Sequence, residues 1–399
     1  MEIPRLISVD DHVIEPAHVW QENLPIGYRD SGPVLVRRRG RSVFAGKTWV
    51  LEEDDTAPWA DRWSYDGTLF PIDRTFAAVS FPREDRGSGA MIFDDMRAGC
   101  YDRKARLADM DTNHTEASLC FPTFPRFCGQ TFLEAKDREL AAACIRAYND
   151  WMIDDWCAGD AYGRLLPLTL VPLWDAAAAA DEVRRCAQKG SHAICFTESP
   201  PDLDLPSIFT DVWEPLWQAC EETATVVNMH IGSSSRFPRT SADAPPLVSI
   251  ALTHEAAERA LTDWLCSGIL ERFPTFKIAL SEGQAGWIPF LLERLDRSQA
   301  QWGSMSGAPI SRPPSTYVPG RVYACTYDEY TGLALRDRIG MGQLMFETDY
   351  PHTDSTFPDS KAVAERMVTS AGLDEAETRA LLRGNAIDCY GLASRGLVA

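Results

Sequence analysis

The feature that most constrains this fold is a regular alternation of short apolar segments with helical segments along most of the 399 residues. Eight segments have the length and apolar content of buried strands. They are residues 5–12, 116–122, 165–173, 193–198, 226–232, 277–283, 322–327 and 344–350. Helical sequence separates several of them, as in residues 134–156, 175–188 and 212–222, and more follows the last strand in residues 374–392. Such units form parallel sheets, and eight of them predict a closed (β/α)₈ barrel, although counting alone does not exclude an open sheet.

Residues 21–100 do not follow this alternation. Residues 32–55 have the pattern of a small β-hairpin, whereas residues 57–67 and 82–91 are rich in Gly, Pro and charge and are expected to be loops. We therefore expect one barrel domain over residues 1–399, with residues 21–100 inserted after the first strand. An insertion at that point lies over the barrel mouth and would act as a lid.

Charge and cysteine usage exclude several classes of protein. The formal net charge of −19 argues against a nucleic-acid partner, because phosphates would be repelled. Eleven cysteines occur without a C-x-x-C pair, and the first residues have no apolar signal core, so reduced thiols in the cytoplasm are expected. No run of 18 apolar residues is present, so no membrane span is expected.

Acids and histidines occur at the predicted strand ends. Asp10 and His12 are two residues apart on the first strand, so both side chains point inward. His230 ends the fifth strand and Asp349 the eighth, which neighbours the first in a closed barrel. All strand ends meet at one rim, so two imidazoles and two carboxylates would converge there. This set suits a divalent ion such as zinc, manganese or iron.

Several longer stretches support a resemblance to a known family. They are "VDDHVIEP", "VVNMHIGSSS", "SGILERFPTFKIALSEGQAGWIPFLLERLD", "FETDYPHTDSTFP" and "GNAIDCYGL". Together they resemble the amidohydrolase-related, metal-dependent (β/α)₈ enzymes, which include aminocarboxymuconate semialdehyde decarboxylase and resorcylate-type decarboxylases. The resemblance implies a metal held by Asp10, His12, His230 and Asp349. It also implies hydrolysis or nonoxidative decarboxylation of a small organic acid or related polar compound, and assembly as a homodimer or with a homologous chain.

The chain departs from the decarboxylase pattern at the sixth strand. Those enzymes carry a catalytic histidine there, whereas this chain has Ser281 and Glu282. A carboxylic acid could take over proton transfer if burial raised its pKa. We therefore expect Asp349, Glu282 and His352 to be the catalytic residues.

More donors crowd this rim than one ion requires. Glu15, Glu198, Glu282 and His352 are candidates for a second metal site, because a single ion needs only about four protein ligands. A related branch of the family holds two metals and activates oxygen, as in 2-aminoisobutyrate hydroxylase. The alternatives are therefore a dinuclear iron or manganese oxygenase that hydroxylates a small acid, or a partner subunit of such an enzyme.

Substrate contacts are less strongly indicated. Arg126 follows the second strand and could pair with a substrate carboxylate, or equally with a surface acid. Asp354 lies beyond the eighth strand at the same rim. A nucleophilic hydrolase is disfavoured because the sequence has no G-x-S-x-G motif.

Overall fold

The computed structural model describes residues 2–45 and 48–399. Eight parallel strands form its centre, in two hydrogen-bonded groups ordered β1-β7-β8 and β13-β12-β11-β10-β9. Their bounds are β1 (Leu6–Val13), β7 (Thr115–Pro122), β8 (Leu165–Pro167), β9 (Ala193–Phe196), β10 (Val226–His230), β11 (Ile278–Ser281), β12 (Val322–Thr326) and β13 (Leu344–Phe346). Most are shorter than the sequence predicts, because the last residues of the predicted segments continue into the loops of the rim.

Backbone hydrogen bonds join the two groups on both sides. Thr169, just past β8, donates its amide to the Ala193 carbonyl at 3.0 Å and accepts from the Cys195 amide at 3.2 Å. On the other side the Asp349 amide donates to the Asp10 carbonyl at 2.9 Å. The eight strands therefore form a ring, and the predicted (β/α)₈ barrel is confirmed.

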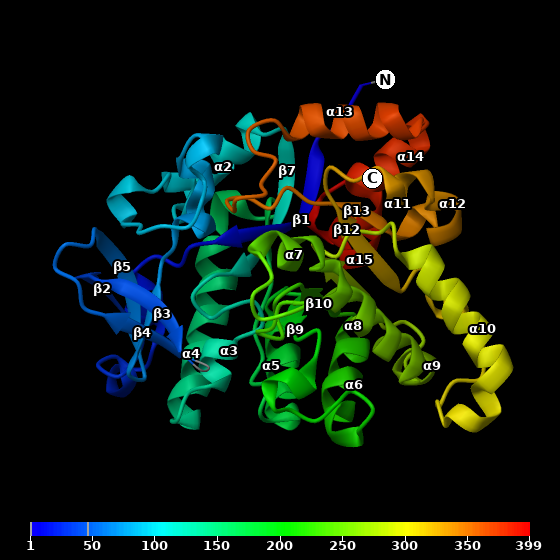
Figure 1. Cartoon of the computed structure of the whole chain (residues 1–399), viewed down its shortest axis with the longest axis horizontal. Coiled ribbons are helices and arrows are strands. Elements are labelled where there is room, and N and C mark those ends of the chain that lie inside the picture. Colours follow the sequence, from blue (N-terminus) through cyan, green and yellow to red (C-terminus); the bar gives the residue numbers. More distant parts are fainter. Residues whose placement is uncertain (1, 46–47) are drawn as a thin grey trace.

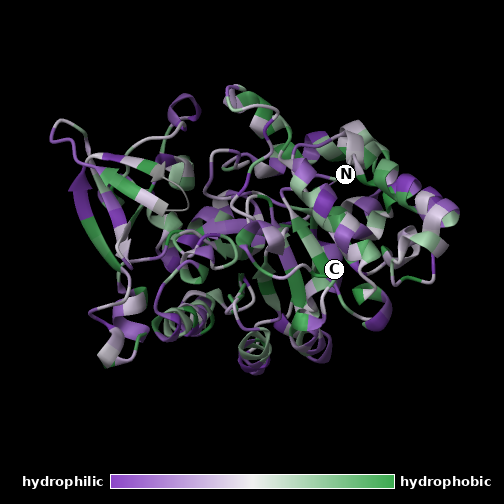
Figure 2. Ribbon diagram, turned by 60° about the horizontal axis from the view of Figure 1, so that its bottom comes forward, coloured by the Kyte–Doolittle hydropathy of each residue, from purple (hydrophilic) through white to green (hydrophobic). Residues whose placement is uncertain are grey.

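Helices surround the strands, and the longer ones bury apolar residues on one side (Figure 2). Asp137 and Asp175 begin α4 and α5 by accepting hydrogen bonds from the first free amides of those helices, which is the usual role of aspartate at a helix start. The helices are α1 (His18–Asn23), α2 (Arg103–Thr112), α3 (Gln130–Leu133), α4 (Arg138–Trp151), α5 (Ala176–Gln188), α6 (Glu214–Thr223), α7 (Pro246–Ala251), α8 (His254–Cys266), α9 (Ile269–Arg272), α10 (Ile288–Ser306), α11 (Thr331–Ala334), α12 (Arg336–Ile339), α13 (Ser360–Ala371), α14 (Glu375–Arg379) and α15 (Asn385–Tyr390). In the described part of the chain, no helix is both long and apolar enough to cross a bilayer.

The insertion contains two small antiparallel sheets, one more than the predicted hairpin. Their strands are β2 (Val34–Arg39), β3 (Arg41–Ala45), β4 (Thr48–Glu52), β5 (Trp59–Tyr65) and β6 (Thr68–Pro71). The prediction of a loop over residues 57–67 is wrong, because β5 lies there between β2 and β6. The charged residues Asp61 and Arg62 give this segment the composition of a loop, whereas Trp63 and Tyr65 are buried against the barrel.

The insertion contacts the loop that follows β13 at the barrel mouth. The Val79 amide donates to the Pro351 carbonyl at 3.2 Å, and the Thr353 hydroxyl donates to the Arg86 carbonyl at 3.1 Å. The insertion forms the separate lobe at the left of Figure 1. It therefore lies beside the rim at which the strands end.

Candidate metal centre

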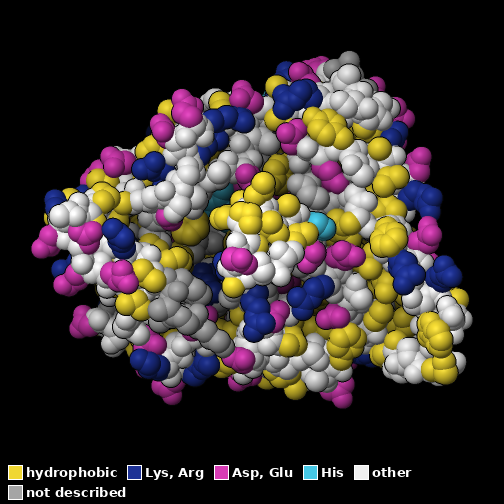
Figure 3. Space-filling view, in the orientation of Figure 1, with side chains coloured by type: hydrophobic (Ala, Val, Ile, Leu, Met, Phe, Trp, Pro, Cys, Tyr) yellow, Lys and Arg dark blue, Asp and Glu magenta, His cyan; other side chains and the backbone are white. Residues whose placement is uncertain are grey.

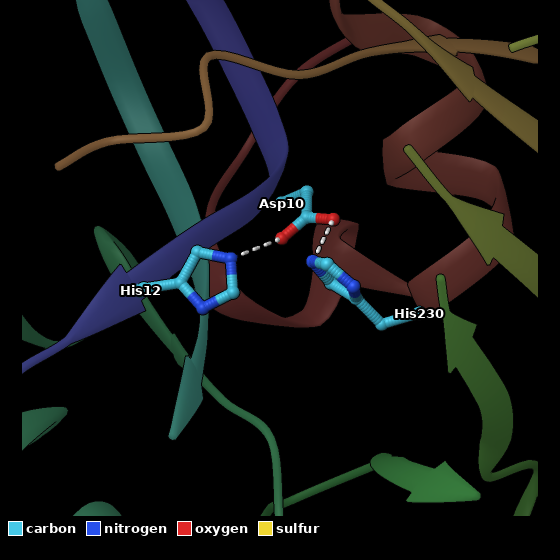
Figure 4. A group of neighbouring side chains, drawn as sticks. All are labelled: Asp10, His12 and His230. Carbon is cyan, nitrogen blue, oxygen red and sulfur yellow. Dashed lines mark ion pairs between the residues drawn. The ribbon is translucent and has the colours of Figure 1, made fainter. Parts of the chain in front are cut away.

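Three side chains from two strands meet at the centre of the rim (Figure 4). Asp10 and His12 lie on β1 and His230 is the last residue of β10. One Asp10 oxygen lies 3.3 Å from His12 Nε2, and the other lies 3.4 Å from His230 Nε2. The carboxylate thus stands between two imidazole rings, and all three side chains are fully buried.

These atoms have the spacing of metal ligands rather than of hydrogen-bonded partners. Among the described residues, neither oxygen of Asp10 has a hydrogen bond, and Nε2 of His12 and of His230 has none either. Buried polar atoms without partners are costly. Two ligand atoms about 2.1 Å from one zinc ion, at tetrahedral or slightly smaller angles, lie about 3.0–3.4 Å apart. The donor set therefore fits a divalent cation, which would satisfy the unpaired atoms.

The imidazole of His230 is held in the orientation that a ligand needs. Its Nδ1 donates to the carbonyl of Ile231 at 2.7 Å, which leaves the Nε2 lone pair facing Asp10. Phe127 stacks on the ring with the centroids 4.0 Å apart. Burial lowers the pKa of His230 to about 3 and lowers that of His12 well below its usual value. Both rings are neutral at physiological pH, as metal binding requires.

Asp349 and His352 lie on the adjacent side of His12. Asp349 Oδ1 is 3.5 Å from His12 Nε2 and 3.0 Å from His352 Nδ1, so these three residues form a second group of close donors. His352 also stacks on His12 at 3.7 Å between centroids. Asp349 has a φ of +50°, a conformation that costs energy outside glycine and recurs at functional sites.

Glu282 completes the rim at the end of β11. Its Oε2 lies 3.5 Å from His230 Nε2, and its φ of +55° is also left-handed. The pKa of Glu282 is raised well above its usual value, mainly by burial and secondly by repulsion from Asp349. The structure therefore brings together the three predicted catalytic residues, Asp349, Glu282 and His352, with the four predicted metal ligands.

Glu347 is a buried acid of this centre that the sequence analysis missed. It accepts a hydrogen bond from the Glu282 amide at 3.2 Å. The pKa of Glu347 is raised mainly by burial and secondly by repulsion from Glu282. The pKa of Asp10 is likewise raised mainly by burial and secondly by repulsion from Glu347. The sequence does indicate this position, because Glu347 stands two residues before Asp349. Asp10 and His12 have the same spacing, which puts two side chains on one face of a strand. A divalent cation would offset this concentration of buried carboxylates.

Asp11 was also left without a role by the sequence analysis, and it organises the strands beneath the rim. Its carboxylate accepts from the hydroxyls of Ser8 at 3.0 Å and Thr348 at 2.5 Å, and from the Tyr350 amide at 2.9 Å. The Ser118 hydroxyl donates to its other oxygen. Asp11 therefore ties β1 to β7 and to the segment after β13, which sets the donor residues of those segments relative to each other.

The other two predicted second-site acids accept hydrogen bonds from loops of the rim, although the second oxygen of Glu198, Oε2, is buried and has no partner among the described residues. Glu198 accepts at one oxygen from the Ser234 hydroxyl at 2.6 Å and from the Gly232 amide at 3.1 Å. Glu15 uses both oxygens, which accept from the amides of Thr123 at 2.8 Å and Phe124 at 2.9 Å. The structure thus brings Glu282 and His352 to the donor set, while Glu15 caps the loop after β7.

Replacing Glu15 by alanine is expected to lower the free energy of unfolding by about 2–4 kcal/mol, because two buried amides lose their acceptor. Metal content should stay unchanged, since both carboxylate oxygens of Glu15 accept hydrogen bonds from backbone amides. Chemical denaturation and elemental analysis measure the two quantities. Glu22→Ala, an exposed change in α1, is the control and should alter stability by less than about 0.5 kcal/mol. Loss of metal from Glu15→Ala would contradict this role.

The predicted substrate contacts lie at the outer edge of the site. Arg126 is ion-paired with Glu134 at 2.9 Å and donates to the Ser235 hydroxyl, in the loop after β10. Asp354 is exposed and close enough to the rim to raise the pKa of Asp349, after the larger effect of burial. Their roles toward a substrate stay predictions.

Comparison with known proteins gives the family. The profile of the amidohydrolase family matches residues 17–392. A gamma-resorcylate decarboxylase of Rhodococcus jostii (strain RHA1) is 25% identical over 319 residues, which cover 75% of this chain and 91% of that protein.

Two solved structures share the fold. An amidohydrolase from Mycobacterium avium subsp. paratuberculosis K-10 superposes with a TM-score of 0.72 and 20% identity, covering 98% of this chain and 99% of that one. A dihydroxybenzoic acid decarboxylase from Polaromonas sp. JS666, solved with bound manganese, superposes with a TM-score of 0.56 and 19% identity, covering 79% and 92%. The ring of eight strands, the donor set at its rim and the match over nearly the whole chain lead to one conclusion: this chain belongs to the amidohydrolase family of metal-dependent barrel enzymes.

Proposed function

We propose that this protein catalyses the metal-dependent, nonoxidative decarboxylation of a small hydroxylated aromatic acid. The observation that carries the proposal is the largely buried carboxyl of Glu282, 3.5 Å from His230 and open to the rim. Decarboxylation needs a proton donor beside the metal, and Glu282 stands in that place. The names of the gamma-resorcylate and dihydroxybenzoic acid decarboxylases similar to this chain support the choice of substrate class.

Asp10, His12, His230 and Asp349 would hold the cation, which attracts the oxygens of the substrate and stabilises negative charge on it. In the reaction the bond between the ring carbon and the carboxylate carbon breaks. CO₂ leaves without the bonding electron pair, and the ring carbon takes a proton from the Glu282 carboxyl. Water then returns a proton to Glu282. Phe127 and the insertion limit access of bulk water to this step.

Hydrolysis is the second reading of the same donor set. Asp349 would then accept the proton of a water molecule that attacks the substrate. Hydrolysis is the less favoured reaction, because it would leave the buried carboxyl of Glu282 without a role. The products separate the two: CO₂ and a shortened acid in one case, and two fragments containing the elements of water in the other.

The second donor group of His12, Asp349 and His352 supports a further candidate, a dinuclear iron or manganese oxygenase. That reaction would consume O₂ and an external reductant. Counting metals on protein grown with iron and manganese tests it. Two equivalents with O₂-dependent turnover would favour the oxygenase over decarboxylation.

Removing the metal is expected to abolish activity reversibly. Protein treated with a chelator and dialysed should release no CO₂ from a panel of mono- and dihydroxybenzoates, and added manganese or zinc should restore release under anaerobic conditions. Manometry or a coupled carbonate assay measures the CO₂. Full activity of the stripped protein, or a strict need for O₂, would overturn the proposal.

We further propose a cytoplasmic location and assembly as a dimer or with a homologous chain. All eleven cysteines are unpaired and ten are buried, which suits a reducing compartment. Phe290, Trp302 and Met305 are exposed apolar side chains of α10 on which a second chain could pack. Light scattering of the purified protein measures the assembly.

A further inference from the structure

A cavity of about 970 Å³ lies between the insertion and the loops that follow β7 and β9. Figure 3 shows the molecule hollowed between the insertion and the barrel. Six aromatic side chains stand among charged and polar residues in its walls: Trp49, Trp63, Tyr65, Phe70, Phe124 and Trp174. Among the described residues, none of the metal donors lines it. The cavity is at the upper end of the size range of small-molecule sites, so a single ring fills only part of it.

The cavity and the metal centre share their walls on two sides. Arg126 lines the cavity, and the next residue, Phe127, stacks on the metal-site ring of His230. On the other side Phe70 lines the cavity and stacks on Phe76 at 6.1 Å between centroids. Phe76 in turn lies 6.1 Å from the ring of His352. The cavity and the metal centre therefore lie next to each other.

Two cations on the cavity rim lack an acidic partner among the described residues. Lys136 is exposed, and Arg138 lies over the Trp174 ring at 4.8 Å and donates to main-chain carbonyls, including that of Leu133 at 2.5 Å. In contrast, Arg236 on the same rim is paired with Asp202 at 3.1 Å. Lys136 and Arg138 are thus available to an anionic group.

We propose that this cavity binds the distal part of the substrate. A planar aromatic body stacks on the walls, and an anionic group at its far end meets Lys136 and Arg138, while the carboxylate to be lost reaches the metal centre. The substrate class is then an extended aromatic acid with two acidic ends, selected by the insertion. This proposal rests on the proposed decarboxylation only for the reaction of the carboxylate at the metal centre; binding in the cavity does not depend on it.

Binding in metal-stripped protein tests the cavity without turnover. The probe is 8-anilinonaphthalene-1-sulfonate, an aromatic anion whose fluorescence rises in an apolar site. We expect naphthalene-2,6-dicarboxylate to displace it at least about tenfold more effectively than benzoate, because only the larger acid spans the walls and the cations. Equal displacement by the two acids would overturn the proposal.

Two variants locate the binding. Trp174→Ala and Arg138→Gln should each raise the Kd of naphthalene-2,6-dicarboxylate by about three- to tenfold, through lost stacking and lost charge. Matched controls are Trp302→Ala on α10 and Arg146→Gln, which is exposed on the same helix as Arg138; neither should change the Kd. Circular dichroism must show that both cavity variants fold, because Arg138 also donates to the Leu133 carbonyl. Unchanged affinity in both folded variants would overturn the assignment.

The two proposals fail in different ways. Selective binding that the cavity variants weaken, without CO₂ release from any acid, would retain the cavity and refute decarboxylation. CO₂ release from single-ring acids by a protein that does not discriminate between the two competitors would retain decarboxylation and refute the cavity.

Discussion

Replacing His230 by alanine is expected to lower the affinity for the metal by more than about 100-fold, since even residues that merely support a ligand contribute about 10–100-fold. The variant loses a neutral donor that the Ile231 carbonyl holds in position. It also leaves Asp10 with one imidazole neighbour in place of two. Activity should fall in proportion to bound metal. Elemental analysis of the purified protein and titration with manganese or zinc measure the effect.

His254→Ala is the matched control for that variant. His254 is the first residue of α8, and the one hydrogen bond of its ring within the described part of the chain joins it to the Ala251 carbonyl at 3.2 Å. It should retain metal and activity. Circular dichroism must show that both variants fold. A folded His230→Ala protein that keeps one full equivalent of tightly bound metal would refute the ligand set.

Replacing Glu282 by glutamine is expected to lower kcat by about 10²–10⁴-fold, the usual contribution of a general acid. The amide keeps the shape of the side chain and cannot deliver a proton to the substrate carbon. Metal content should stay near that of the wild type, because Asp10, His12, His230 and Asp349 remain. Steady-state kinetics with elemental analysis separates the two effects.

Two further measurements make the role of Glu282 specific. Glu282→Asp keeps an acid one methylene further back and should recover part of the activity, whereas a purely structural role would be served better by glutamine. In D₂O the product of the wild-type enzyme should carry deuterium at the carbon that lost CO₂. Equal kcat for Glu282→Gln and wild type at equal metal content would show that another group supplies the proton.

Much of the candidate site follows from local sequence. The two-residue spacing of Asp10 and His12 puts both side chains on one face of β1, and strands that alternate with helices must end at a common rim. His230 and Asp349 fall at that rim for the same reason. Glu347 obeys the same spacing relative to Asp349, so the sequence alone also carries the position of this acid at the rim.

What the sequence by itself determined was the order of the strands and the rim at which the donors collect, because the periodicity of a strand and the parallel direction of βα units are local properties. Only the tertiary structure decided which donors meet. Glu15 follows the same strand as His12, yet it accepts from the amides of a loop about 110 residues away, and its sequence position carries no trace of that loop. Strand β5 was hidden for a similar reason, since its charged residues become a strand only through pairing with β2 and β6. The aromatic cavity combines residues from distant segments such as Trp63 and Trp174, and a space of this kind exists only when packing has brought its walls together.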